Sequence, residues 1–255
     1  MLPGISLFIS NINSTSGDVV LRNSDVVLIA KTNSSKIELS TTLDSEMTDI
    51  IVNHDLCSEI GQLQQVSKST SELTVSENMM YSIDEVYLIG TSQVTYNFTT
   101  VESPQVATGC VANVTTFLEY PDYMEFLTSG NARNPNKMHC LSPHEPLTFH
   151  LNSSDGDSYH FVGLKSFEFA TLNYTVFKEL LKYDSTNTDG LSCTLSTSRS
   201  DCTISLNNSQ EQEACVLASL QDTNNTFISL FYFINHSSDV IFWLAIIFSI
   251  LGFTV

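Results

Sequence analysis

Residues Gln93–Val101 read QVTYNFTTV, and this stretch decides the fold class. Its apolar residues alternate with polar ones, in the order Val94, Thr95, Tyr96, Asn97, Phe98 and Thr99. A period of two is typical of a β-strand that buries one face and leaves the other in water. The pattern therefore predicts a half-buried strand, with Asn97 on its wet face.

The same alternation returns further along the chain, at Leu147–Leu151. Leu147, Phe149 and Leu151 form the apolar set there, with polar residues between them. Asp155-Gly156 follows, and this dipeptide favours a tight turn between antiparallel strands. We therefore predict a β-hairpin whose return strand is Tyr159–Val162.

Many other short segments rich in β-branched and aromatic residues have the composition of strands. They are Val19–Leu21, Val26–Ala30, Glu85–Ile89, Ser166–Ala170, Leu172–Phe177, Leu191–Leu195, Cys202–Leu206, Ala214–Leu220 and Phe227–Ile234. Turn-rich stretches separate several of them, and such spacing is typical of an antiparallel β-sandwich. The predicted fold class is all-β: a β-sandwich-like ectodomain followed by a C-terminal transmembrane helix.

Helix signals are weak. Leu56–Val66 is compatible with a short helix, and Phe177–Tyr183 is compatible with a helix or with an extension of the strand before it. Residues 31–50 and 67–82 are polar and loop-like. Residues 121–146 hold most of the prolines and are expected to form a long surface loop tied down by Cys140.

We expect an N-terminal β segment over residues 1–80, a main disulfide-linked β domain over 81–235, and the transmembrane helix at 240–255.

The C-terminal residues Val240–Val255, VIFWLAIIFSILGFTV, carry no charge. We interpret them as a membrane anchor with Trp243 near the outer interface. A helix of this length spans roughly 24 Å, against a hydrocarbon core of about 30 Å, so the span is expected to continue beyond the sequence given. Two alternatives remain open: a lipid-anchor signal, although the polar spacer is missing, and a buried core segment. The N-terminal MLPGISLFIS is a poor signal peptide, so the true start is expected upstream.

Six cysteines occur, at Cys57, Cys110, Cys140, Cys193, Cys202 and Cys215. None is spaced as C-x-x-C, which zinc and thioredoxin-type sites normally need. We interpret them as three disulfides formed in an oxidising compartment, the alternative being buried free thiols. Six cysteines allow 15 pairings. The arrangement we favour joins Cys110 with Cys140, Cys193 with Cys202, and Cys57 with Cys215.

Sequons of the form N-x-S/T strengthen the secretory interpretation. Candidate glycosylation sites are Asn13, Asn33, Asn97, Asn113, Asn152, Asn173, Asn207 and Asn224, with a ninth sequon at Asn235 beside the predicted anchor. The net charge of −18 repels nucleic acid, which excludes DNA or RNA as a partner. We therefore place residues 1–239 on the extracellular or lumenal side of a membrane.

Catalytic motifs such as G-x-S-x-G, HExxH, GxxxxGK[ST] and GxGxxG do not occur in the sequence. His139 and His144 flank Cys140, and His150 and His160 are expected to face each other across the predicted hairpin; for both pairs a structural role is the simpler interpretation than a metal site or pH sensor. Asn152–Asp157 fails the calcium-loop template because Leu151 stands at its first ligand position. The acid pairs Asp44/Glu46 and Glu211/Glu213 are expected to be solvated. We predict no cofactor, no metal and no catalysis.

Two segments, Gly90–Phe98 (GTSQVTYNF) and Ser158–Phe169 (SYHFVGLKSFEF), resemble lumenal β domains of membrane-anchored RING ubiquitin ligases. They cover under a tenth of the chain. The resemblance implies a zinc-binding RING domain beyond Val255, on the other side of the membrane.

Three functional hypotheses follow. The first is the ectodomain of a single-pass membrane glycoprotein that acts in recognition, adhesion or receptor-type binding, with a protein or glycan as its partner and with its binding face free of glycans. The second is a secretory-pathway hydrolase whose active site is assembled from distant residues. The third is a lumenal sensor or scaffold whose active domain, for example a ubiquitin ligase, lies beyond Val255.

Overall fold

The structure is a computed structural model, and it describes residues 13–23, 25–34, 36–43, 48–102, 109–153, 157–184, 191–206, 213–221 and 227–236. The chain forms two compact units. Unit 1 contains residues 1–60 and 185–255, and unit 2 is the insertion Gly61–Asp184. The insertion begins and ends at one point, because the Asp184 N–H donates to the Gly61 carbonyl at 2.9 Å.

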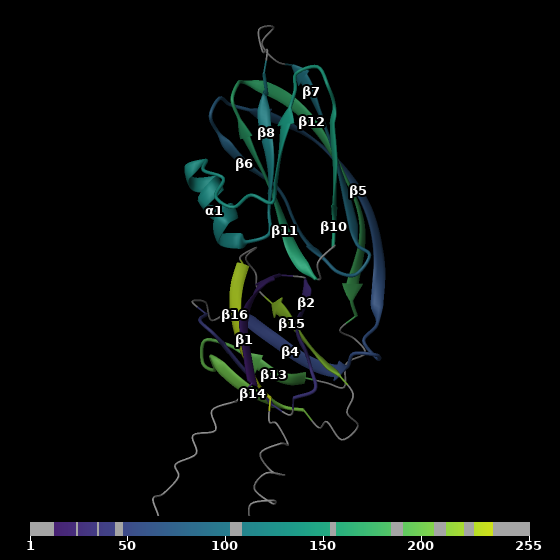
Figure 1. Cartoon of the computed structure of the whole chain (residues 1–255), viewed down its shortest axis with the longest axis vertical. Helices are drawn as coiled ribbons and strands as arrows, with labels where there is room; N and C mark the ends of the chain where they lie inside the picture. Colours follow the sequence, from purple (N-terminus) through teal and green to yellow (C-terminus); the bar gives the residue numbers. More distant parts are fainter. Residues whose placement is uncertain are drawn as a thin grey trace, which may run out of the picture. The chain divides into compact units, whose positions relative to one another are not determined.

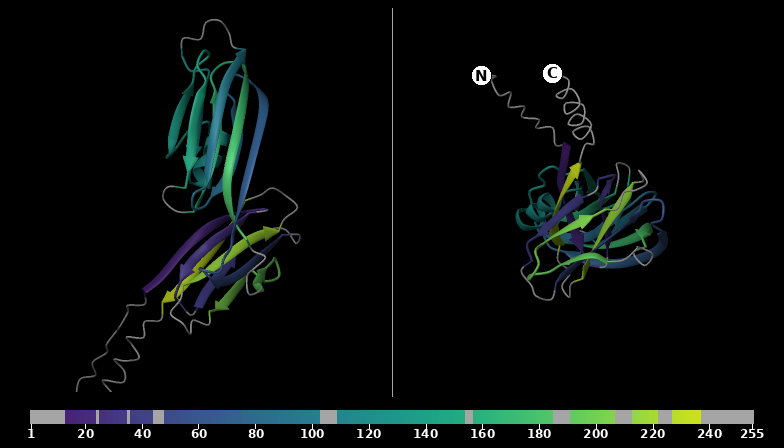
Figure 2. Two further views of the ribbon diagram at one scale, coloured as in Figure 1. Left: turned by 90° about the vertical axis from the view of Figure 1, so that its right-hand side faces the viewer. Right: turned by 90° about the horizontal axis from the view of Figure 1, so that it is seen from below.

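Unit 1 consists of two four-stranded sheets. Sheet A contains, in spatial order, β1 (Asn13–Arg22), β16 (Phe227–His236), β3 (Lys36–Thr41) and β14 (Asp201–Ser205). Sheet B contains β13 (Leu191–Leu195), β4 (Asp49–Leu56), β15 (Ala214–Gln221) and β2 (Val26–Thr32). β1 and β16 come from opposite ends of the chain and lie side by side, purple and yellow in Figure 2.

Alternation drives the packing of unit 1. In β3, Ile37 and Leu39 are buried while Lys36, Glu38 and Ser40 are exposed, as expected for a strand with one wet face.

Gly17 in β1 lies opposite Tyr232 in β16. A Cβ atom at Gly17 would stand 2.6 Å from the Tyr232 hydroxyl, so the tyrosine covers the glycine directly.

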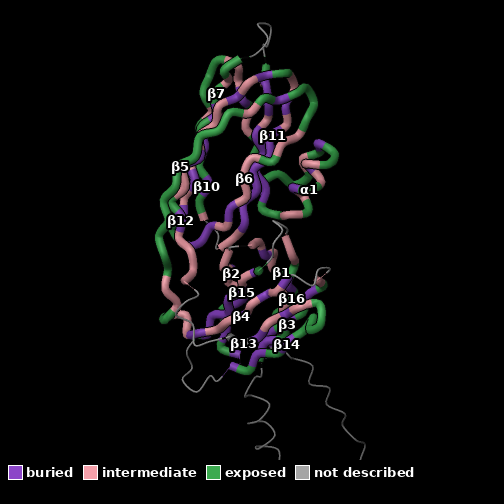
Figure 3. The backbone as a smooth tube through the Cα atoms, turned by 180° about the vertical axis from the view of Figure 1, so that it is seen from behind, coloured by how far each residue is buried: buried purple, intermediate pink, exposed green. Residues whose placement is uncertain are grey.

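Unit 2 also consists of two four-stranded sheets. Sheet C contains β10 (Leu147–Asn152), β7 (Gln93–Glu102), β12 (Ala170–Tyr183) and β5 (Gln62–Val75). Sheet D contains β6 (Met80–Leu88), β11 (Ser158–Ser166), β8 (Ala112–Phe117) and β9 (Lys137–Leu141). The edge strand β5 is exposed along most of its length (Figure 3). Every pairing between two strands in the described residues is antiparallel, so the all-β sandwich class is confirmed.

The inner faces of sheets C and D share one apolar core. Val94, Tyr96 and Phe98 are fully buried, which confirms the alternation predicted for this strand. The ring of Phe149 in β10 stacks on Tyr96 with ring centroids 4.9 Å apart. Stacked aromatic pairs of this kind add about 0.5–1.5 kcal/mol beyond the area they bury.

The helix α1 (Tyr120–Ser129) packs on the outer face of sheet D (Figure 1). Its Tyr123 and Phe126 are buried, and the Phe126 ring lies 5.2 Å from the Phe117 ring, centroid to centroid. Beneath the helix lies Gly163, where a Cβ atom would stand 2.5 Å from Cε1 of Phe126. The absence of a side chain at Gly163 is therefore what lets the helix approach the sheet.

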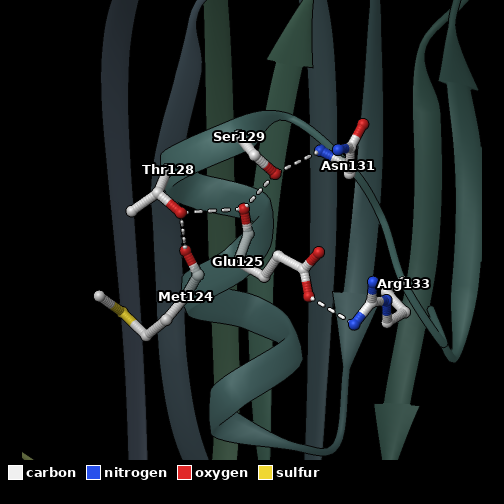
Figure 4. A network of polar contacts seen from close by, with 6 residues as sticks. All are labelled: Met124, Glu125, Thr128, Ser129, Asn131 and Arg133. Atoms are coloured by element: carbon white, nitrogen blue, oxygen red, sulfur yellow. Dashed lines mark hydrogen bonds and ion pairs between the residues drawn. The ribbon is translucent and has the colours of Figure 1, made fainter.

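The last turn of α1 is held by polar contacts (Figure 4). The hydroxyls of Thr128 and Ser129 donate to the Glu125 carbonyl, and the Ser129 hydroxyl accepts from the Asn131 N–H at 3.2 Å. Arg133 reaches back to the Glu125 carboxylate at 3.4 Å. Gly130 ends the helix with a φ of 71°, a left-handed conformation that favours glycine.

The predicted hairpin over residues 147–162 is wrong. β10 pairs with β7 in sheet C, whereas β11 pairs with β6 and β8 in sheet D. The chain between them therefore crosses from one sheet to the other. Alternation predicts which residues face the core, but it does not predict which strand is the neighbour.

Other local predictions are also corrected. The predicted helix at Leu56–Val66 is instead the end of β4, a turn and the start of β5, and Phe177–Tyr183 continues strand β12. The stretches 31–50 and 67–82, expected to be loops, contain β3 and parts of β4, β5 and β6. The expected loop at 121–146 contains most of α1 and all of β9. In β3 and β5, exposed polar residues outnumber the apolar ones, which hides the strand pattern, whereas β4 has Ile50 and Val52 buried and no exposed residue, so this reason does not apply to it.

The compact units group the chain differently from the division expected at residue 80, because unit 1 takes strands from both ends of the sequence. The predicted anchor at 240–255 lies outside the described residues. Within the residues that are described, the chain has no helix of the length and apolarity needed to cross a membrane.

Candidate functional site

The outer face of sheet A carries the most distinctive surface in unit 1. The strand register places Phe231 of β16 between Asp18 of β1 and Ser40 of β3, and Asp201 of β14 follows in the same row. The next row contains Phe233 between Ser16 and Glu38, followed by Thr203. We call Asp18, Glu38, Asp201, Phe231 and Phe233 the aromatic-acidic face.

Both rings of this face are open to solvent. Phe231 is 49% exposed and Phe233 is 38% exposed, while their strand neighbours Leu230 and Ile234 are buried. The sequence Phe227–Ile234 (FISLFYFI) supplies apolar residues to both sides of β16. Because only one side is buried, the apolar residues of the other side lie in water. Exposed apolar patches rimmed by polar residues are where interaction surfaces are sought, so we take this pair as the candidate site of unit 1.

A shallow hollow of about 250 Å³ lies on this face. Its lining residues come from β3, β14 and β16: Glu38, Leu39, Ser40, Asp201, Cys202, Thr203, Phe231, Tyr232 and Phe233. The Glu38 carboxylate also meets Lys36 on its own strand, with Nζ and Oε1 2.6 Å apart. That ion pair is exposed, and exposed pairs contribute little to stability.

The cysteines form three disulfides, in the same pairs that the sequence analysis favoured: Cys57–Cys215, Cys110–Cys140 and Cys193–Cys202. Cys193 belongs to β13 of sheet B and Cys202 to β14 of sheet A, so this bond joins the two sheets of unit 1. Since Cys202 lines the hollow beside Asp201, the disulfide also fixes the strand that presents this carboxylate.

A second hollow, of about 430 Å³, lies in unit 2. It is lined by Leu118, Asn136, Lys137, His150, Leu151, Asn152, Ser158 and His160. The structure thus brings His150 and His160 to one hollow from two different sheets, although not across a hairpin. His150 is exposed and its Nδ1 lies 2.9 Å from the Thr95 hydroxyl.

His160 is only 5% exposed. Its Nε2 lies 3.3 Å from the Ser158 hydroxyl, and its buried Nδ1 has no hydrogen-bond partner within the described residues. Burial lowers the pKa of the His160 imidazole, because water no longer solvates the charged form. A third histidine of unit 2, His139 in β9, stacks on Phe149 with ring centroids 4.6 Å apart, and burial together with Lys137 lowers its pKa too.

The two sheets of unit 2 are also linked by a polar contact inside the sandwich. The Tyr96 hydroxyl donates to Oδ2 of Asp84, and Nζ of Lys178 lies 2.7 Å from Oδ1 of the same carboxylate. Burial, with the Asp84 carboxylate beside it, raises the pKa of the Tyr96 phenol. This group is fully committed to internal bonds, so we assign it to stability.

The sequons that the structure describes lie on strands or just after them. Asn97, Asn152 and Asn173 are on β7, β10 and β12 of sheet C, with Asn97 and Asn152 exposed and Asn173 half-buried. Asn33 is exposed after β2, Asn113 is half-buried in β8, and Asn13 begins β1. Asn207 and Asn224 lie outside the described residues.

Among the described residues, no three His, Cys, Asp or Glu side chains converge as metal ligands would. The acids Asp44, Glu46 and Glu211 lie outside the described part, and the solvation of those pairs stays a prediction. The aromatic-acidic face was not foreseen. Its one signal in the sequence is that FISLFYFI, apart from Ser229, is apolar on both sides of the strand.

No family model matches this chain, and no curated protein matches it. Distant likenesses exist among solved structures. The Yersinia pseudotuberculosis-derived mitogen is 10% identical, with 48% of this chain and 93% of that chain covered and a TM-score of 0.26. The infectious bursal disease virus VP2 subviral particle is 6% identical, with coverages of 84% and 66% and a TM-score of 0.30. The T=1 particles derived from that virus are 9% identical, with coverages of 90% and 71% and a TM-score of 0.27. These scores are too low to carry an argument about function.

Proposed function

We propose that this chain is the extracellular or lumenal part of a single-pass membrane glycoprotein, and that it acts as a non-catalytic binding domain of recognition, adhesion or receptor type. The observation that carries the proposal is an exposed aromatic pair ringed by carboxylates, on a sheet fixed in place by a disulfide. Disulfides persist in oxidising compartments, which supports the extracellular or lumenal placement. The membrane part of the proposal rests on the sequence 240–255 alone.

The distribution of sequons supports the same assignment. The outer face of sheet C presents Asn97 and Asn152 among hydroxyl side chains, and the Thr148 hydroxyl donates to Oδ1 of Asn97 at 2.6 Å. Glycans at these positions would stand in water without displacing core residues. We assign this face of unit 2 to glycans and the aromatic-acidic face of unit 1 to binding.

Expression of the chain in a secretory host tests the compartment. We expect its mass to fall on treatment with an N-glycosidase and its mobility to change on reduction. Asn97→Gln and Asn152→Gln should each remove one glycan, whereas Asn131→Gln, which alters an asparagine outside any sequon, should leave the mass of the glycoprotein unchanged. An unglycosylated chain whose mobility does not respond to reductant contradicts the proposal.

A further inference from the structure

The aromatic-acidic face has a chemistry that selects one class of partner. We propose that it binds an extended basic segment of another polypeptide, in which arginine side chains stack on Phe231 and Phe233 and pair with the adjacent carboxylates. The inference rests on the proposed binding function and specifies its partner.

The register sets the geometry of this contact. Neighbouring strands in a sheet lie about 4.8 Å apart, and directly opposed side chains have Cβ atoms about 4.5–5.5 Å apart. Asp18 therefore flanks Phe231, and Glu38 flanks Phe233, at distances that one guanidinium group bridges. A cation over the ring face within about 6 Å of the centroid gains from the ring quadrupole, and the carboxylate beside it adds a charge-assisted bond.

The same strand already contains one example of this contact. Phe227 lies on the same side of β16 as Phe231 and Phe233, because all three are separated by even numbers of residues. Its register partner is Arg22, whose Cζ lies 5.8 Å from the Phe227 ring centroid. At Phe231 and Phe233 the opposite residues in the register are acids or hydroxyls instead. The cation over these two rings would therefore come from another polypeptide.

The surface charge narrows the choice of partner further. The chain has a net charge of −18, and this side of sheet A carries the carboxylates of Asp18, Glu38 and Asp201 against the cations of Lys36 and Arg22. A second copy of the chain would place like charges opposite each other, and nucleic acid or an anionic lipid surface would be repelled. A basic segment is attracted at long range and also neutralises the carboxylates on contact.

Arginine fits this face better than lysine does. Its planar guanidinium stacks on aromatic rings and forms two parallel bonds to a carboxylate, whereas the lysine ammonium is a compact and strongly hydrated charge. The Lys36–Glu38 pair is 46% and 49% exposed, so an incoming arginine competes for Glu38 at little cost.

The test uses the full chain, expressed in a secretory host and purified in detergent, with fluorescein-labelled nine-residue peptides of alternating serine and a second residue. The second residue is arginine, lysine or glutamate. Binding is measured by fluorescence anisotropy at low and at physiological salt. We expect the arginine peptide to bind best, the lysine peptide more weakly and the glutamate peptide not at all, with affinity falling as salt rises.

Variants locate the contact on the chain. Phe231→Ser with Phe233→Ser should weaken the arginine peptide by about tenfold or more. Asp18→Asn with Glu38→Gln and Asp201→Asn should weaken it as much and also reduce the salt dependence. The matched controls lie in unit 2: Phe169→Ser, at a phenylalanine 59% exposed, and Glu72→Gln with Glu102→Gln and Glu145→Gln, which removes the same number of exposed carboxylates as the sheet A variant. Both should bind within about twofold of the parent chain.

Equal losses in the sheet A variants and in the unit 2 controls would mean that only the overall negative field attracts the peptide, and the inference would fail. No detectable binding of the arginine peptide at low salt overturns it too. If the phenylalanine variants instead lose binding to neutral oligosaccharides on an array, the inference fails while the proposed binding function survives. Circular dichroism of each variant, unchanged from the parent, shows that the sheet remains folded.

Discussion

Phenylalanines lie on the outer faces of sheets A and D of this protein, but their rings are exposed on sheet A and buried on sheet D. On sheet D, Phe117 and Phe161 are covered by α1 and are at most 1% exposed. On sheet A, Phe231 and Phe233 remain 49% and 38% exposed. Aromatic residues on a strand therefore do not by themselves indicate a core. What decides is whether a second element, here a ten-residue helix docked over Gly163, buries the rings.

Removal of a covered ring and removal of an exposed ring should differ strongly in their effect on stability. Phe126→Ala, which removes a buried ring from α1, should lower the free energy of unfolding of unit 2 by about 3–5 kcal/mol. Phe231→Ala should change that of unit 1 by no more than about 0.5 kcal/mol, because a surface ring has little packing to lose. Hydrogen exchange read from peptides of β11 and β16 reports each unit separately. Similar losses at both sites would mean that the sheet A face is also a packed surface.

The second prediction concerns how unit 1 is stabilised without such a cover. Unit 1 contains Cys57–Cys215 and Cys193–Cys202, with sequence separations of 158 and 9 residues. While unit 2 is folded, Gly61 and Asp184 stay together, so the longer loop behaves as roughly 36 residues. Chain entropy then predicts a loss of about 4 kcal/mol for Cys57→Ser with Cys215→Ser, and about 2.5 kcal/mol for Cys193→Ser with Cys202→Ser.

Denaturant unfolding of the two double variants measures this difference. If removal of the Cys193–Cys202 bond lowers the free energy of unfolding more than removal of Cys57–Cys215 does, then this bond acts through its link between sheets A and B rather than through chain entropy. In that case the shape of the aromatic-acidic face, and not only its stability, should depend on that bond.

The third prediction sharpens the role of the helix. Gly163→Ala places a Cβ atom 2.5 Å from Cε1 of Phe126 and should cost about 1–3 kcal/mol through overpacking. Gly109→Ala is the matched control in the same unit, because an added Cβ there meets no atom within 4 Å. Shortening the opposing ring with Phe126→Leu should make the Gly163→Ala loss smaller, a coupling that a double-mutant cycle measures. Additive losses of stability from Gly163→Ala and Phe126→Leu would show that the added methyl group displaces the whole of α1 rather than the Phe126 ring alone.

The sequence predicts the fold class because the central strands are one-sided. Val94, Tyr96 and Phe98 alternate with polar residues, a period that matches a strand and not a helix, and all three are fully buried. β5 was missed because it is an exposed edge strand whose residues are polar on both faces. The helix α1 was missed although its signals are present: Pro121 in its first turn and Gly130 at its end are the usual boundaries of a helix.

The sequence alone does not predict the candidate site, because the strand topology is what brings its residues together. Asp18, Glu38, Asp201 and Phe231 come from four strands that are far apart in the sequence, and only the register brings them into adjacent rows. Phe227–Ile234 is a strand, as its composition predicts. A strand at which both alternating sets are apolar has two possible inner faces, and the sequence does not say which of them finds a covering layer.

The last prediction concerns two histidines of unit 2, and the change expected in stability is small. Burial lowers the pKa of His160, and burial beside Lys137 lowers that of His139, from the ordinary value of 6.5. The unfolded chain then binds more protons than the folded one as the pH falls through 6.5, so unit 2 should lose stability between pH 7.5 and pH 5.5. His160→Gln should reduce this slope, and adding His139→Gln should reduce it further. Hydrogen exchange of β11 peptides at the two pH values, corrected for the intrinsic exchange rate, measures the slope. An unchanged slope in the double variant would mean that these imidazoles are protonated as readily inside the sandwich as in water, and that the hollow beside His160 admits solvent to the ring.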